Sequence, residues 1–178
     1  SFARMQADVL SLAAVELLPL VKQTRAIDER SRDALELLAR WNGEMTVDKP
    51  QPLVFNAWMR ELARRIFEDE LGAALLDDYF EQRNVHAPLV NVLKGGKDAV
   101  WCRDTRPDAV ETDCASLLST SLAATLASLE NTYGKDMTAW RWGDAHLART
   151  EHRPFSRVPW LAPLFESRVP SPGDTYTV

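Results

Sequence analysis

The chain has 178 residues, of which 46% are hydrophobic and 26% are charged, and its net charge is −5 at pH 7. This length suits a single domain with a packed core, and the composition is that of an ordinary soluble globular protein. The acidic balance and the dispersed Lys and Arg residues argue against nucleic-acid binding, and the most apolar early stretch is too short to span a membrane.

The chain begins with Ser1, in the stretch SFARMQADVLSLAA. In some enzymes an amino-terminal serine is the nucleophile and its own α-amino group is the general base. That role requires the amine and the hydroxyl to be held rigidly in a cleft. Residues 2–21 instead have the spacing of an amphipathic helix, so we expect Ser1 to be chemically ordinary.

The predicted helix over residues 2–21 has one apolar and one polar face. The apolar face comprises Phe2, Met5, Val9, Leu12, Ala13 and Leu17, and the polar face comprises Arg4, Asp8 and Ser11. Gln6 and Glu16 lie on the apolar side, so each should have a polar partner in the fold.

Further helices are predicted between residues 28 and 93. Asp28 is the expected N-cap of one that ends at the Asn-Gly pair of residues 42–43, after a stripe of Ala34, Leu37, Leu38 and Trp41. Pro50 and Pro52 predict a loop. Helical spacing then resumes at Phe55, Met59, Leu62 and Ile66 and continues to Gly72. Shorter helices are predicted at residues 73–80 and 87–93.

Residues 94–113 are polar and are predicted to be an irregular loop. Asp113 is the expected cap of a long helix that ends near Gly134. The apolar stripe of this helix is formed by leucines at helical spacing, namely Leu118, Leu122, Leu126 and Leu129.

The sequence changes character after residue 150, which divides the chain into a helical region (1–150) and a proline-rich segment (151–178). Five of the ten prolines lie in the second segment and predict an extended path over another surface. The last residues, GDTYTV, predict a turn followed by a strand. Because no partner strand is predicted upstream, we expect this strand to be half of a larger structure.

Cys102 and Cys114 are the two cysteines of the chain. They do not form a Cys-x-x-Cys pair, and the three histidines do not complete a metal-binding spacing around them. Two interpretations therefore remain open at this point, namely two reduced thiols or one disulfide that closes a short loop.

The chain contains no convincing catalytic, cofactor-binding or metal-binding group. We expect His86, His146 and His152 to satisfy buried carbonyls, and Trp140 and Trp142 to anchor a turn. The acidic runs at residues 68–70 and 77–78 are expected to point to different solvent-facing sides of a helix, so neither predicts a carboxylate pair.

Five stretches, which together cover nearly the whole chain, resemble the penicillin acylase (penicillin amidase) family in their order. They are MQADVLSLAA, LLARWNGEMTVD, LVFNAWMRELARRIFEDELG, WRWGDAHLARTEHRPF and PSPGDTYTV. The first resembles the family's Gln-x-Asp-x-x-Ser-x-x-Ala helix, and the fourth resembles its Trp-x-Trp-Gly-x-x-His-x-x-x-x-x-His pattern. The chain departs from the family at Asn42, where Asp is usual, and at Asp174, where many members have a second Gly.

The resemblance implies a mainly α chain, the helical region of an N-terminal-nucleophile hydrolase β subunit, with an extended Pro-rich tail and a truncated C-terminal strand. Family members expose a serine by self-cleavage, and this serine attacks an acyl amide while an asparagine and a backbone N–H hold the oxyanion. In the family these groups, and the calcium ligands, precede the Gln-x-Asp helix. We therefore expect an inactive internal or C-terminal piece of the β subunit, with Ser1 a cut end.

The family is typically exported to the periplasm or secreted, where disulfides persist, so the resemblance implies a Cys102–Cys114 bridge. It also implies the α subunit and the β-subunit sheet core as partners. Without them, apolar residues of the tail should be exposed and favour self-association; these are Phe155, Val158, Trp160, Leu161, Leu164 and Phe165.

The intact enzyme is expected to cleave an acyl amide of the penicillin, cephalosporin or acyl-homoserine-lactone type. The competing hypothesis is a free-standing helical binding module. The expected strand at the end of the chain disfavours that alternative, because a self-sufficient domain would not end in half of a sheet.

Overall fold

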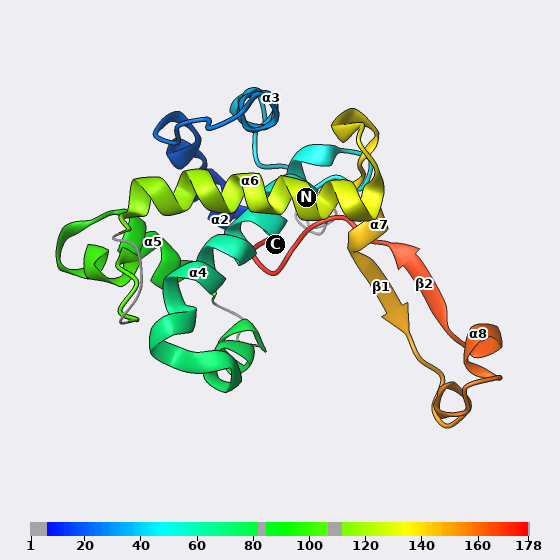
Figure 1. The fold of residues 1–178 in the computed structure, drawn as a ribbon. Coiled ribbons are helices and arrows are strands. Elements are labelled where there is room, and N and C mark those ends of the chain that lie inside the picture. Colours follow the sequence, from blue (N-terminus) through cyan, green and yellow to red (C-terminus); the bar gives the residue numbers. More distant parts are fainter. Residues whose placement is uncertain (1–6, 82–84, 107–111, 178) are drawn as a thin grey trace.

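The structure consists of a helical body and a projecting arm (Figure 1). The computed structural model describes residues 7–81, 85–106 and 112–177. The α-helices are α2 (Leu12–Leu17), α3 (Glu29–Ala39), α4 (Pro50–Glu81), α5 (His86–Leu93), α6 (Cys114–Tyr133), α7 (Trp142–Ala145) and α8 (Ala162–Phe165). The 3-10 helices are η1 (Leu18–Lys22), η2 (Gly96–Cys102), η3 (Met137–Ala139) and η4 (Phe155–Arg157), and the strands are β1 (Leu147–Thr150) and β2 (Ser167–Pro170). The mainly α class is confirmed.

The centre of the body is the contact between α4 and α6, with α3 packed against both (Figure 1). All four leucines predicted for the stripe of α6 are buried. Trp58 of α4 has no exposed surface, and its indole N–H lies 3.2 Å from the Leu118 carbonyl oxygen and 3.0 Å from Ser121 Oγ. The largest buried side chain is therefore also satisfied as a hydrogen-bond donor.

Both predicted N-caps are confirmed. The Asp28 carboxylate accepts from the Ser31 N–H at 2.7 Å, and the Asp113 carboxylate accepts from the Ser116 N–H at 2.7 Å. Ser116 Oγ in turn accepts from the Asp113 N–H, which completes a capping box. These backbone hydrogen bonds lower the pKa of both aspartates. Gly134 ends α6 at φ +87°, as predicted.

The prediction of a long first helix is wrong for the described residues. Residues 7–11 are not helical, and α2 begins only at Leu12, with Ser11 as its N-cap. The predicted faces are also reversed at this point, because Ser11 is fully buried while Leu12 is 62% exposed. Ser11 Oγ accepts from the Ala14 N–H, so the buried hydroxyl has a hydrogen-bond partner as the N-cap of α2.

Two predicted loops contain helical structure instead. Pro50 and Pro52 lie in the first turn of α4, where the missing N–H groups would be unpaired in any case. Residues 96–102, within the predicted loop of residues 94–113, form η2. The end predicted at Gly72 corresponds to a break within α4, where φ is +71° and ψ is 168°.

The expected strand at the end of the chain is not formed in the residues described to 177, because local hydrogen bonds close a turn there. The Asp174 carboxylate accepts from the Tyr176 N–H at 2.8 Å, and Thr177 Oγ1 donates to the Asp174 carbonyl at 2.9 Å. Such side-chain bonds to the backbone compete with strand pairing. The strands of the structure lie earlier, in β1 and β2.

Candidate functional site

The arm comprises residues 147–170, in which β1 and β2 pair antiparallel and η4 and α8 form the tip (Figure 1). The register places Leu147 opposite Pro170 and Arg149 opposite Arg168. All eight strand residues are exposed, and no residue of the arm is buried. The arm is therefore a hairpin that projects from the body, and residues 151–170 of the proline-rich segment lie in it.

Trp142 and His146 form the base of the arm. The Trp142 indole N–H donates to the Gly173 carbonyl at 3.1 Å, and the Trp142 ring stacks on that of His146 with centroids 4.6 Å apart. His146 Nδ1 lies 2.8 Å from the Ser171 carbonyl oxygen. Trp140 is also buried and donates to the Gly134 carbonyl. Both tryptophans therefore anchor chain reversals, as predicted.

Gly143 lets three segments meet closely at this base. Its N–H donates to the Val47 carbonyl at 2.9 Å, and a Cβ built at Gly143 would lie 2.9 Å from Pro170 Cβ and 3.1 Å from Val47 Cβ. The Gly173 N–H donates to the Met45 carbonyl on the same loop. The direction of the arm is thus fixed by contacts that leave no room for a side chain.

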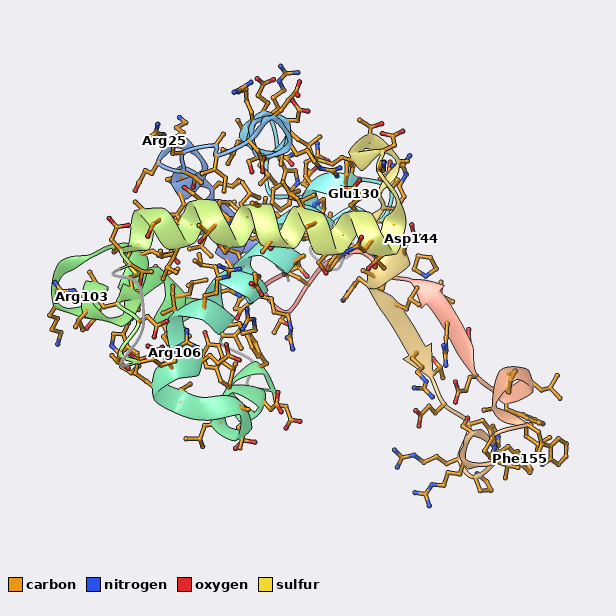
Figure 2. The ribbon with its side chains drawn as sticks, in the orientation of Figure 1. Arg25, Arg103, Arg106, Glu130, Asp144 and Phe155 are labelled. Atoms are coloured by element: carbon orange, nitrogen blue, oxygen red, sulfur yellow. A yellow bond between two sulfur atoms is a disulfide. The ribbon has the colours of Figure 1, made fainter. Side chains whose placement is uncertain are left out.

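The tip of the arm carries exposed apolar side chains, with Phe155 at its far end (Figure 2). Trp160 is 73% and Leu164 is 76% exposed, and Phe155 and Phe165 are each 41% exposed. Phe155 and Phe165 contact each other with ring centroids 4.8 Å apart. Four of the six apolar residues predicted to be exposed in the tail are therefore exposed, whereas Val158 and Leu161 are half-buried.

Charge is arranged unevenly along the arm. The Glu166 carboxylate receives hydrogen bonds from Arg149 and Arg168, which lie opposite each other in the hairpin. Arg149 in particular lowers the pKa of Glu166. Arg153 and Arg157, near the tip, have no carboxylate partner among the described residues. The tip is therefore both apolar and positively charged.

The three histidines are brought to separate places. His146 bonds a carbonyl, as predicted, but His152 stacks on Phe155 at the exposed tip, so the buried carbonyl expected for it is wrong. The His86 ring packs edge-on against Tyr176, and burial lowers its pKa, so the imidazole is neutral at pH 7. Its Nδ1 is buried and has no hydrogen-bond partner among the described residues, so the carbonyl expected for His86 is wrong as well. Within the described ranges, no serine or threonine hydroxyl donates to an imidazole, and no acid, histidine and cysteine cluster could hold a metal.

Cys102 and Cys114 form a disulfide with Cα atoms 5.0 Å apart, which joins the end of η2 to the start of α6. This outcome confirms the bridge that the resemblance implied. Glu16 has the polar partner predicted for it, since Lys94 Nζ lies 2.6 Å from its carboxylate. Ser1 and Gln6 lie outside the described residues.

In the acidic run at residues 68–70, Asp69 and Glu70 influence each other's pKa, although Glu70 is exposed as expected. Burial, followed by a hydrogen bond to Asp69, raises the pKa of Glu70 to about 7. Burial acts in the same direction on Asp69, but hydrogen bonds from Glu70 and from the Thr105 N–H lower its pKa. Adjacent helical acids normally diverge, and the contact with residue 105 that fixes Asp69 leaves no signal in the local sequence.

No helix in the described part of the chain combines the length and apolar character needed to cross a bilayer.

Residues 1–178 match the penicillin amidase family. The chain is 30% identical to the acyl-homoserine lactone acylase QuiP of Pseudomonas aeruginosa, over 90% of this chain and 21% of that protein. It is 28% identical to the QuiP acylase of Pseudomonas fluorescens, over 75% of this chain and 16% of that protein. The chain thus spans about a fifth of the length of these curated relatives, and it belongs to the penicillin amidase family.

Proposed function

We propose that this chain is the helical part of the β subunit of an N-terminal-nucleophile acyl-amide hydrolase, and that its role is architectural. The nucleophilic serine of that enzyme lies outside residues 1–178. The body and the arm pack on the remainder of the enzyme, namely the α subunit and the β-subunit sheet core. Alone, the chain is inactive.

The relatives support the reaction class. Two acyl-homoserine lactone acylases align with 90% and 75% of this chain. Both are named for acyl-homoserine lactones, so an amide with an acyl chain and a lactone head is the substrate class that we propose for the whole enzyme. The disulfide supports a periplasmic or secreted location, since disulfides persist in oxidising compartments.

The exposed arm is the observation that carries the architectural role. A two-stranded hairpin is at best marginally stable by itself in water. In the described part of the chain the sheet consists of β1 and β2 alone, and all eight of their residues are exposed. Exposed Trp and Leu side chains at its tip favour burial against a partner. The remaining four-fifths of a relative's length would supply such a surface.

The test compares the 178-residue chain with the polypeptide of its complete reading frame, using an acyl-homoserine lactone and a chromogenic acyl amide. The complete polypeptide should release homoserine lactone or chromophore, and the chain alone should release neither. The proposal would be overturned by turnover in the chain alone that disappears in Ser1→Ala, because Ser1 would then be the nucleophile.

A further inference from the structure

The body contains a cavity that the arm does not touch. Its volume is about 360 Å³, and it lies between α4, the start of α5, α7 and residues 174–176. The walls are mostly apolar and include Leu53, Ala57, Phe80, Leu89 and Trp142. Pockets that bind small molecules have this size and this kind of lining, with a few polar groups that orient the ligand.

Among the described residues of this lining, Arg60 is the one arginine or lysine. Its guanidinium lies over the Phe80 ring, 4.0 Å from the centroid, and no carboxylate among the described residues pairs with it. The next arginines of the helix differ, since Arg64 pairs with Glu61 and Glu68 and Arg65 pairs with Glu61. The sequence explains the contrast, because no acid lies three or four residues from Arg60 on either side.

The other polar groups of the lining are already engaged or uncharged. Asp174 is the one acid among the lining residues that the structure describes, and its carboxylate accepts from the Tyr176 N–H at 2.8 Å. Asn56 donates to the Pro52 carbonyl, and Tyr176 OH accepts from the His86 N–H. His86 is neutral because burial lowers its pKa. The described residues of the lining thus carry one positive charge, on the Arg60 guanidinium, and one negative charge, on Asp174.

A second cavity, of about 410 Å³ between α4 and α6, shares Ala57, Arg60 and Phe80 with the first. Glu61, Glu68 and Asp77 line only this second cavity. An anion therefore meets less opposing charge in the first cavity, which is the one with Trp142 and Leu89 in its walls.

We propose that the first cavity binds a small monocarboxylic acid with an apolar body, whose carboxylate pairs with Arg60. The guanidinium is planar and is held over an aromatic ring, so its donors are oriented before the ligand arrives. The apolar walls receive the alkyl or aromatic body of the acid. This site is independent of the proposed function and lies apart from the arm.

Hexanoate is the probe, titrated into the ¹⁵N-labelled chain by NMR, with hexan-1-ol as the uncharged probe of the same length. Saturable shifts are expected at lining amides such as those of Ala57 and Leu89, and hexan-1-ol should bind about tenfold more weakly, in line with a charge-assisted pair. Arg60→Gln should weaken the binding of hexanoate about tenfold. Arg60→Lys keeps the charge but loses the paired N–H donors of the guanidinium, and it should weaken the binding by a few-fold.

Arg103→Gln is the matched control. Arg103 is exposed, has no carboxylate partner among the described residues and lines neither cavity, and Figure 2 places it at one end of the body. This variant should bind hexanoate like the unaltered chain. Equal affinity for hexanoate and hexan-1-ol, wild-type hexanoate affinity in folded Arg60→Gln, or no saturable shift of the lining amides would each overturn the proposal.

Discussion

The body and the arm are both regular structure, yet they are stabilised in different ways. In the body, α4 and α6 bury a continuous set of apolar side chains that includes Trp58, Phe55 and Leu122. In the arm no residue is buried, and order comes from one β ladder, the Glu166 ion pairs and a small aromatic cluster. Since burial is the main stabilising term in folding, the body is suited to hold its own fold and the arm is suited to contact a partner.

The largest expected difference between the two regions is in the stability lost when one tryptophan of each is truncated. Trp58→Ala removes a fully buried ring and its two hydrogen bonds, and should lower the free energy of unfolding by about 4 kcal/mol. Trp160→Ala, at a residue 73% exposed, should change it by less than about 0.5 kcal/mol. Urea denaturation followed by circular dichroism measures both; similar losses would mean that the arm is part of the cooperative core.

The disulfide should stabilise the body but not the arm. Replacing both cysteines, in Cys102→Ser with Cys114→Ser, should lower the free energy of unfolding by about 3 kcal/mol, because the bridge restricts the unfolded chain. The arm should be unaffected, since the bridge joins η2 to α6. Thiol titration of the unreduced, denatured chain should find no free thiol, and two free thiols would contradict the bridge.

Gly143 tests the junction between the two regions. In Gly143→Ala the added methyl group would overlap Pro170 and Val47, which should destabilise the base of the arm by about 2 kcal/mol. The Ser171 and Gly173 amides, which hydrogen-bond across this base, should exchange faster with deuterium. Ala145→Ser, at an exposed position of the same helix, is the control and should leave their exchange unchanged.

The smallest expected effect is on the pH dependence of the stability of the body. Because the folded-state pKa of Glu70 is raised to about 7, its contribution to stability is fully present below the ordinary glutamate value of 4.5 and is lost as the pH rises through 7. Glu70→Gln should therefore remove a small fall in stability between pH 4.5 and 7. A fall of the same size in the variant, measured by thermal unfolding across this range, would exclude Glu70 as its source.

The sequence predicted best where a local signal determines the structure. The caps at Asp28 and Asp113 and the leucine stripe of α6 depend on neighbouring residues, and all three are confirmed. The strand expected at residues 175–178 is not formed in the residues described to 177. A local interaction again determines the structure, because the Asp174 carboxylate accepts from the Tyr176 N–H and Thr177 Oγ1 donates to the Asp174 carbonyl. Helical periodicity alone misplaced Ser11 and Leu12, since it extended the helix through residues 7–11, whereas Ser11 is the N-cap and α2 begins at Leu12.

The features that bring distant segments together were not predictable from periodicity. At the base of the arm, the loop at residues 45–49, α7 and residues 171–173 meet near Gly143. The sequence indicated only that Trp140 and Trp142 anchor a turn there. The Asp69–Glu70 pair depends on Thr105, and the cavity beside Arg60 depends on the return of residues 174–176 to the body. Each is a long-range packing outcome that a single sequence does not encode in adjacent positions.

The central claim is that the arm docks on the remainder of a larger acylase while the body folds by itself. Hydrogen–deuterium exchange of the arm backbone tests it directly, in the 178-residue chain and in the polypeptide of the complete reading frame. We expect fast exchange across residues 147–170 in the chain alone and strong protection of the same residues in the complete polypeptide. The protection of α4 and α6 should be similar in both proteins. Equal arm exchange in the two proteins would contradict the docking role.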